Sequence, residues 1–384
     1  MSSTKLKTAN IVSLDATKLT GTLPAISGAN LTGVAPFTVS ASDPVVTTNP
    51  SGGVGTIWMN STSGETYCCT DATAGSNVWT NCGTGFDHTH SDSFQGEIAG
   101  FSSGGHSTAR VDVIDTFSFL TDGGSTDHGN LTVSRYQVSG SSSSTHGYTH
   151  GGTGNASPSK LDHIDKFAFN TGSNATDVGN LANARSQTFG LTSPTHGYCA
   201  GGDQPPVTKN IQKYSFSSDG NATNVGNLSL ERSIGATSVT TTHGYSSGGY
   251  HLDAVPFPYI TIDRFAFSSD GTALDVGDLS VTRYSCSGTS SLTHGYVAGG
   301  YVSGVNANTA AVERFSFAST ASGADVGDLQ VANGAGSSGH SSTTHGYVAY
   351  KDDGIQKYNY SSSITSSTIG QNTHQRTLCA GTQY

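Results

Sequence analysis

Short stretches in which apolar and polar residues alternate recur along the chain at intervals near 50 residues. Alternation with a period of two predicts half-buried β-strands. The copies are IDTFSF at 114–119, IDKFAF at 164–169, IQKYSF at 211–216, IDRFAF at 262–267, VERFSF at 312–317 and IQKYNY at 355–360. Six copies of one strand predict an internal repeat.

A second phrase, Thr-His-Gly-Tyr, precedes these strands and occurs at 145–148, 195–198, 242–245, 293–296 and 344–347. A sixth copy is AGFSSGG at 99–105, which overlays HGYSSGG at 243–249 and puts Ala99 in the histidine register. The six glycines are then 47, 50, 47, 51 and 51 residues apart. Such a period fits the blade of a β-propeller and exceeds that of helical-hairpin repeats.

Two further strands complete each repeat. One carries the phrase DHGNL, DVGNL, NVGNL or DVGDL, ending at 131, 181, 228, 279 and 329, with TIGQN at 368–372 as a degraded copy. The other is small and rich in Ser and Thr, and an arginine precedes it in five repeats. The C-terminal RTLCAGTQY overlays RYSCSGTSS at 283–291, so it supplies the strand that the first repeat lacks. Closure by both ends hides the edges of an open sheet.

Double glycines follow the Thr-His-Gly-Tyr strand at 104–105, 151–152, 201–202, 248–249 and 299–300. A small strand, a double glycine and then a phrase such as Val-Glu-Arg-Phe resemble the kelch repeat. The sixth repeat departs from the pattern with Ala349-Tyr350, and the usual tryptophan of the fourth kelch strand is absent. The resemblance implies an all-β fold in which residues 99–384 form a six-bladed, kelch-like β-propeller closed by the C-terminal strand.

The first hundred residues have a different pattern. LTGTLP at 19–24 and LTGVAP at 31–36 repeat after twelve residues and cannot form a core alone. TIWMN and TYCCT around Ser63-Gly64, followed by a strand around Trp79, predict a small β module. Both stretches resemble segments of tail-fibre and related structural proteins of marine, cyanophage-like bacteriophages. We therefore divide this region into a fibre-like anchoring and oligomerisation segment (1–36), a β module (37–86) and a linker (87–98).

Composition and charge exclude several partners. The formal net charge of −10, without a basic patch, argues against nucleic acid. No apolar run is long enough to span a bilayer, and the N-terminus lacks the apolar core of a secretion signal, so we expect synthesis in the host cytoplasm. For Cys68, Cys69 and Cys82 two alternatives stay open: free thiols, favoured by that compartment, or a disulfide from Cys68 or Cys69 to Cys82. No cofactor is expected.

The repeated polar residues have structural and chemical interpretations. A metal or catalytic ring is one hypothesis for His146, His196, His243, His294 and His345. We favour a structural role, in which each histidine bonds to a neighbouring strand or turn, because one repeat has Ala99 instead. For Arg135, Arg185, Arg232, Arg283 and Arg376 we favour blade-to-blade ion pairs with Asp115, Asp165, Asp263 and Glu313 over a guanidinium ring that binds an anionic sugar. DHTH at 87–90 could offer metal ligands, but we favour a solvated linker.

Recognition is expected where the repeats differ, in the loops after the double glycines. The richest of these loops is YHLDAVPFPYIT at 250–261. Flat aromatic faces beside polar groups suit a sugar. The candidate ligand-binding residues are Tyr250, His251, Asp253, Phe257, Tyr259 and Tyr301. The alternative is that Phe257 and Tyr259 fold the loop onto its blade.

The resemblance implies a virion protein, most simply a homotrimeric tail fibre. Its N-terminal region would join other virion structural proteins, and its propeller would bind a host cell-surface glycan or another outer-membrane receptor. The alternative is a purely structural virion component, such as a head fibre, an adaptor or a tail protein, whose propeller docks another virion protein. An enzyme is not expected, because a hydrolase needs two carboxylates around one pocket, and the acids of these loops lie in different repeats.

Overall fold

The computed structural model describes residues 37–83, 95–251, 259–320, 322–334, 338–350, 354–361 and 363–384. Every regular element in these ranges is a β-strand. The chain divides into two compact units, Met1–Asp87 and His88–Tyr384, which we call the N-terminal module and the repeat domain. The fibre-like segment 1–36 and the sequence DHTH at 87–90 lie outside the described residues.

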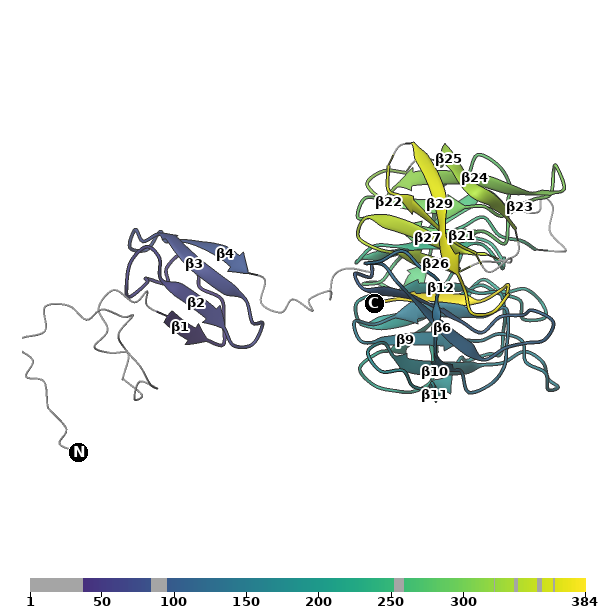
Figure 1. Ribbon diagram of the computed structural model, residues 1–384, viewed down its shortest axis with the longest axis horizontal. Helices are drawn as coiled ribbons and strands as arrows, with labels where there is room; N and C mark the ends of the chain where they lie inside the picture. The colour runs from purple at the N-terminus through teal and green to yellow at the C-terminus, as the bar shows by residue number, and fades with distance from the viewer. Residues whose placement is uncertain are drawn as a thin grey trace, which may run out of the picture. The chain divides into compact units, whose positions relative to one another are not determined.

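The N-terminal module contains one four-stranded sheet in the order β1-β2-β3-β4 (Figure 1). Its strands are β1 (Phe37–Ser40), β2 (Ile57–Asn60), β3 (Thr66–Asp71) and β4 (Val78–Gly83). The expected hairpin of β2 and β3 and the strand around Trp79 are confirmed. Strand β1, which the sequence pattern did not predict, pairs in parallel with β2. Trp58 and Trp79 pack edge to face with their ring centroids 5.8 Å apart.

All six cysteines are free thiols. Cys69 is buried, whereas Cys68 on the opposite face of β3 is half-buried and interacts with Cys82. The free-thiol alternative therefore describes this structure. Among the three, Cys68 is the thiol that lies beside Cys82.

The repeat domain contains six groups of four antiparallel strands, numbered here as repeats 1 to 6 from the N-terminal side. The first strands are β30 (Ala380–Gln383), β8 (Ser139–Ser142), β12 (Phe189–Thr192), β16 (Ala236–Val239), β21 (Ser287–Ser290) and β26 (Ser338–Ser341). The second strands are β5 (Ala99–Ser103), β9 (His146–His150), β13 (His196–Ala200), β17 (His243–Ser247), β22 (His294–Ala298) and β27 (His345–Ala349). Each first strand pairs with the second strand of its own repeat.

The outer half of each repeat is equally regular. The third strands are β6 (Val113–Ser118), β10 (His163–Ala168), β14 (Asn210–Ser215), β18 (Thr261–Ala266), β24 (Ala307–Ser316) and β28 (Gly354–Asn359). The fourth strands are β7 (Thr126–Asn130), β11 (Thr176–Asn180), β15 (Thr223–Asn227), β20 (Leu274–Asp278), β25 (Ala324–Asn333) and β29 (Ile364–Gln371). Two short strands, β19 (Gly271–Thr272) and β23 (Tyr301–Val302), pair with β15 and β24. A two-residue parallel pairing of β25 with β29 joins repeats 5 and 6 into one nine-stranded sheet.

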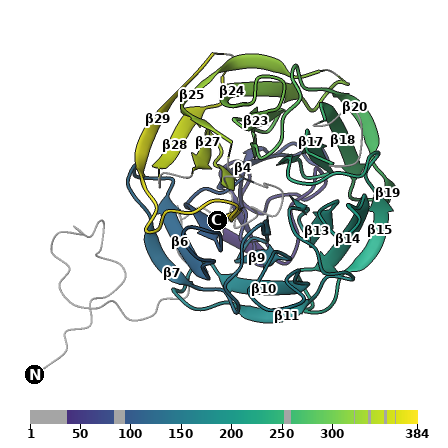
Figure 2. The same ribbon diagram turned by 90° about the vertical axis from the view of Figure 1, so that its right-hand side faces the viewer.

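The six repeats surround a common centre (Figure 2). Their first strands lie innermost, and each contacts the next in the closed order β8, β12, β16, β21, β26, β30 and back to β8. The C-terminal β30 pairs with β5, so the two ends of the domain share the sheet of repeat 1. This is the pairing that the overlay of the two sequence fragments predicts.

Glycine allows the first strands to approach one another. Five of them carry glycine at the same position, and a Cβ built on each would lie between 1.9 and 2.4 Å from a carbonyl oxygen of the preceding first strand; the five are Gly140, Gly190, Gly288, Gly339 and Gly381. The remaining first strand, β16 of repeat 4, has Thr237 at this position. Backbone contact this close explains why small residues dominate these strands, although β12 also carries Phe189 and Leu191 and β26 carries His340.

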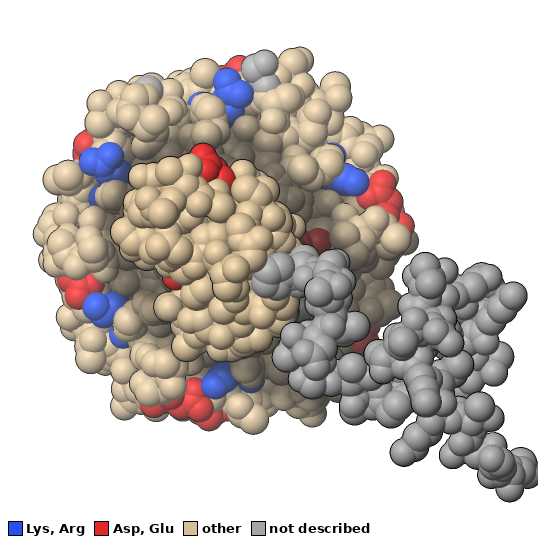
Figure 3. Space-filling view, turned by 90° about the vertical axis from the view of Figure 1, so that its left-hand side faces the viewer, with Lys and Arg blue, Asp and Glu red and all other residues tan. Residues whose placement is uncertain are grey.

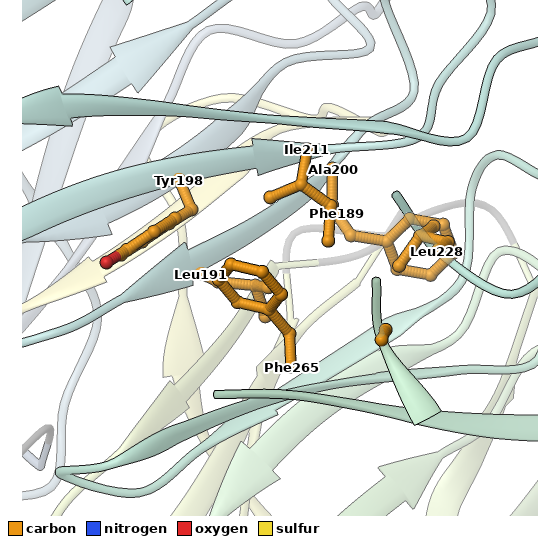
Figure 4. Close-up of a cluster of buried hydrophobic side chains, with 8 residues drawn as sticks. Phe189, Leu191, Tyr198, Ala200, Ile211, Leu228 and Phe265 are labelled. Carbon is orange, nitrogen blue, oxygen red and sulfur yellow. The ribbon is translucent and has the colours of Figure 1, made fainter. Parts of the chain in front are cut away.

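Aromatic stacking joins each repeat to the next. The tyrosine of Thr-His-Gly-Tyr, or Phe101 in repeat 1, packs on the aromatic residue that directly follows the third strand of the next repeat, with centroids 4.6–4.9 Å apart at all six junctions. The preceding glycine leaves room for an aromatic side chain of its own repeat: a Cβ on Gly295 would lie 2.3 Å from the ring of Phe315. Figure 4 shows the buried cluster at the junction of repeats 3 and 4, where Phe265 of repeat 4 packs with Leu191 of repeat 3.

Residues 95–98, which the sequence pattern assigned to the linker, lie against the repeat domain. Gln95 is 1% exposed, and its amide donates hydrogen bonds to the carbonyls of Ser290 and Ser342, both at 2.9 Å. The backbone of Ile98 donates to the carbonyl of Tyr384. The repeat domain thus begins at least four residues before the expected boundary. The Gln95 amide belongs to it because it donates to carbonyls at the ends of two first strands, β21 and β26.

Ion pairs connect neighbouring repeats at the periphery, where Figure 3 shows basic and acidic side chains side by side. The pairs are Lys166–Asp219 (3.0 Å), Lys213–Asp270 (2.7 Å) and Lys357–Asp122 (2.9 Å). Each joins a third strand to the outer turn of the next repeat. Because all three are partly exposed, they contribute little to stability and serve mainly to match adjacent repeats.

Replacing Gly288 by Ala should destabilise the repeat domain strongly, because the new methyl group would lie 1.9 Å from the carbonyl oxygen of Thr237. We expect the free energy of unfolding, measured by urea denaturation, to fall by about 1–3 kcal/mol or more. Gly304→Ala in the same repeat is the control, since nothing lies within 4 Å of a Cβ there. Equal stability of the two variants would contradict the close approach of the inner strands.

Stability should fall as the pH is lowered below about 6.5, because two imidazoles are buried. Burial is the main cause that lowers the pKa of His150 to about 3 and that of His340 to about 4. Below about pH 6.5 both imidazoles become protonated in the unfolded chain but stay neutral in the folded chain. Between pH 6.5 and the pKa of the folded state, each histidine therefore lowers the free energy of unfolding by up to about 1.4 kcal/mol per pH unit.

His150→Ala should therefore flatten the pH dependence, measured by urea denaturation between pH 7 and pH 5. Alanine suits this position because Ala200 and Ala298 occupy it in other repeats. A variant whose stability has the same slope with pH as the parent would contradict the assignment.

Candidate functional site

The five histidines of Thr-His-Gly-Tyr belong to the scaffold. Each places Nδ1 2.7–2.8 Å from the hydroxyl of the preceding threonine, in the turn that enters the second strand. Burial lowers the pKa of all five, so the neutral imidazole is favoured. None of them joins a cluster of three metal-ligating side chains within the described residues. These contacts support the structural interpretation.

The repeated arginines are also part of the interior. All five are at most 3% exposed, and the hypothesis of a guanidinium ring that binds an anionic sugar is therefore wrong. Four of them form buried ion pairs: Arg135–Asp165 (3.1 Å), Arg232–Asp263 (3.0 Å), Arg376–Asp115 (2.9 Å) and Arg283–Glu313. The expectation of blade-to-blade pairs needs correction, because each pair joins the segment just before the first strand to the third strand of the same repeat.

These arginines hold the double-glycine turns. The guanidinium of Arg232 donates to the carbonyls of Gly248 (2.6 Å), Thr261 (2.7 Å) and Ser246 (2.8 Å). Arg185 lacks a carboxylate partner, since Gln212 stands in that place, but it also donates to the carbonyl of the first glycine of its turn, Gly201. Each arginine therefore fixes the point where the chain leaves its second strand for the variable loop.

One cluster has the composition of a metal site. His163, Asp165 and Asp177 of repeat 2 bring one potential ligand atom each within 4.8 Å of one another. Asp165, however, already accepts hydrogen bonds from Thr132 and pairs with the Arg135 guanidinium. A cation placed there would meet that positive charge, so the cluster is better explained as part of the buried ion pair.

The central cavity is also a poor ligand site. It has a volume of about 140 Å³, and the first strands of all six repeats line it with Gly, Ser and Thr. Pockets for small organic ligands are larger, on the order of 300–1,000 Å³, and mostly apolar. The cavity is too small and too polar to resemble one.

The candidate residues of loop 250–261 lie in different surroundings. Asp253 and Phe257 are outside the described residues. His251 is only 9% exposed, with Nε2 3.7 Å from a carboxylate oxygen of Glu231. Tyr259 is half-buried, and burial is the main cause that raises its pKa. Among the described residues of this loop, Tyr250 is the one that joins a group of half-buried aromatic side chains.

The residues directly after the repeated arginines, which we call the scaffold arginines, take part in a set of paired positions. In five repeats the residue after the arginine forms an isolated antiparallel bridge with the residue after the double glycine. We call these ten residues the rim: Thr377–His106, Tyr136–Thr153, Ser186–Asp203, Ser233–Tyr250 and Tyr284–Tyr301. Their backbone places are equivalent, yet their side chains differ from repeat to repeat, as a recognition surface requires.

The rim brings Tyr250 and Tyr301 together through a third ring, that of Tyr284. The Tyr250 and Tyr284 centroids are 4.9 Å apart, and those of Tyr284 and Tyr301 are 5.3 Å apart. All three side chains are half-buried. Burial, followed by the neighbouring Tyr301 and Tyr250, raises the pKa of Tyr284, so its hydroxyl stays protonated at neutral pH. We call Tyr250, Tyr284 and Tyr301 the tyrosine trio.

Sequence reasoning missed Tyr284 and its counterpart Tyr136 because it considered only the loops after the double glycines. A signal was present in the sequence: the position after each scaffold arginine reads Tyr, Ser, Ser, Tyr or Thr, although the arginine itself is repeated. Variation directly beside a constant residue marks a place that the scaffold does not determine.

Comparison with known proteins identifies no matching family model and no matching curated protein. The described residues include no helix with the length and apolar character needed to cross a membrane.

Proposed function

We propose that residues 99–384 form a six-bladed, kelch-like β-propeller whose rim binds a glycan. The closed series of contacts among the six first strands supports this architecture. The double glycines and the repeat period near 50 residues support the likeness to kelch blades.

The observation that carries the binding proposal is the tyrosine trio. Three adjacent, half-buried phenol rings from repeats 4 and 5, tilted by 38° and 49° to one another, together offer apolar ring faces and hydroxyl groups. Sugar rings combine an apolar C–H face with hydroxyl groups, and aromatic residues with a polar tip suit both. The domain binds without catalysis in this proposal, because the buried carboxylates that the described repeats share are committed to arginine.

The biological setting follows from the resemblance of residues 19–36 and 55–85 to bacteriophage fibre proteins. The protein would be a tail-fibre-type virion component, attached to other virion proteins through its N-terminal region and displaying the rim to the host surface. Many copies on one particle would convert weak single-site binding into firm adsorption.

Tyr284→Ala should abolish or strongly weaken glycan binding while leaving the fold intact, because it removes the central ring of the trio. We expect affinity to fall by about tenfold or more, measured by titrating the full chain with a panel of bacterial surface polysaccharides. Leu274→Ala, at an exposed position in β20, is the matched control. The proposal is wrong if no polysaccharide binds the parent protein, or if Tyr284→Ala binds as well as the control.

We further propose that the N-terminal module self-associates. Among residues 37–83, Cys69 is the only fully buried apolar side chain, and six large apolar side chains are at least half exposed: Phe37, Val39, Val45, Val46, Val54 and Val78. A chain this short with so small a core gains stability by burying apolar surface against other copies. Phe37 and Val39 lie on the same, exposed face of β1, while Thr38 and Ser40 on the other face are half-buried. A homotrimer agrees with the fibre-like segment that precedes them.

Replacing both Phe37 and Val39 by Asp should dissociate the oligomer into monomers, because buried carboxylates in the interface are costly. Light scattering coupled to size-exclusion chromatography measures the mass directly; we expect a trimer for the parent chain. Leu274→Asp in the repeat domain is the control and should leave the mass unchanged. A monomeric parent, or an oligomeric double variant, would show that another surface or none mediates assembly.

A further inference from the structure

A second group of side chains occupies the rim at the junction of repeats 1 and 2. His106 follows the double glycine of repeat 1, and Tyr136 follows the scaffold arginine of repeat 2. Their rings lie 5.2 Å apart. This is the rim place where Tyr250 and Tyr284 meet at the junction of repeats 4 and 5. The same backbone geometry therefore presents an imidazole and a phenol here instead of two phenols.

A short hairpin adds a cation to this pair. His106 and Arg110 form an isolated antiparallel bridge, so their side chains are cross-strand neighbours on one face. The Arg110 guanidinium carbon lies 5.1 Å from the centre of the Tyr136 ring. Contact of this kind orients a guanidinium and restricts its motion before any ligand arrives.

Arg110 differs from most cations of the repeat domain because no carboxylate of the described residues forms a salt bridge with it. Its hydrogen-bond partner is the neutral side-chain amide of Asn155, which accepts from Nη1. The salt bridges of the described residues engage Lys160, Lys166, Lys213 and Lys357 and four of the scaffold arginines, but not Arg110. Nε of Arg110 is enclosed and meets no acceptor within the described part of the chain.

We propose that His106, Arg110 and Tyr136 form a subsite for the oxyanion of an acidic sugar, a carboxylate or a phosphate. This deepens the proposed glycan-binding function and rests on it for the identity of the ligand as a sugar. A guanidinium fork binds such oxyanions through two parallel hydrogen bonds, and the Tyr136 ring and the Asn155 side chain hold the Arg110 guanidinium in place at the rim. Because the chain carries a formal net charge of −10, binding of an anion depends on this local cation.

The test uses the full chain and three small probes: glucuronate, glucose 6-phosphate and glucose, each titrated by saturation-transfer NMR. Arg110→Ala should weaken binding of the charged probes by about 10- to 100-fold and leave glucose unaffected. Arg110→Lys should restore only part of the affinity, because it keeps the charge and loses the fork. Comparison of the two charged probes separates the carboxylate source from the phosphate source.

Lys160→Ala is the matched control, because that lysine lies on the rim side of repeat 2 but is paired with Asp203. Equal binding of the charged probes by the parent and Arg110→Ala, or no binding by the parent, would overturn the subsite. The polysaccharide panel tests the wider function separately. If Tyr284→Ala loses polysaccharide binding but Arg110→Ala binds the charged probes as the parent does, glycan binding by the rim is supported and the oxyanion subsite is rejected. If glucuronate binding depends on Arg110 but the parent binds no polysaccharide, the subsite is supported and glycan binding by the rim is rejected.

Discussion

The approach of six first strands to within backbone contact is the constraint on which the repeat domain depends. At that distance a carbonyl oxygen of one strand occupies the space where the next strand would place a Cβ, as at Gly288. The centre must therefore be built from glycine and small hydroxyl residues, which contribute little apolar burial. The apolar contacts that stabilise the domain consequently lie farther out, between the repeats, where the tyrosine of Thr-His-Gly-Tyr packs on the aromatic residue that directly follows the third strand of the next repeat.

The repeat domain contains residues that the fold fixes and, beside them, rim residues that can vary for recognition. Buried arginines fix each double-glycine turn, and aromatic junctions fix the spacing of the repeats, so neither can vary freely. The rim residues next to those arginines keep their backbone pairing whatever side chain they carry, because an isolated bridge uses only main-chain groups. The rim can therefore hold a cluster of phenols in repeats 4 and 5 and an imidazole beside a phenol in repeats 1 and 2.

Much of this organisation follows from the sequence because repetition amplifies weak signals. Six copies of an alternating strand predicted the third strands, and the overlay of Ala99 on the histidine register predicted a strand that lacks the histidine. The sequence was less informative about which side chains contact each other. The arginine partners were expected in neighbouring blades and lie within one repeat, because sequence spacing does not say which sheets a buried side chain spans. Tyr284 escaped notice since its contact with Tyr250 joins residues of different repeats. The parallel pairing of β1 with β2 had no pattern of its own.

The sheet shared by β30 and β5 has a consequence for the order of folding. Its innermost strand is synthesised about 280 residues after its neighbour, as the numbering of Ala380 and Gly100 shows. During translation the aromatic junctions between repeats 2 and 5 can form while repeat 1 still exposes the edge of β5. The ring closes only when β30 has emerged and paired with β5, so the strand of the domain that is synthesised last completes the sheet that began first.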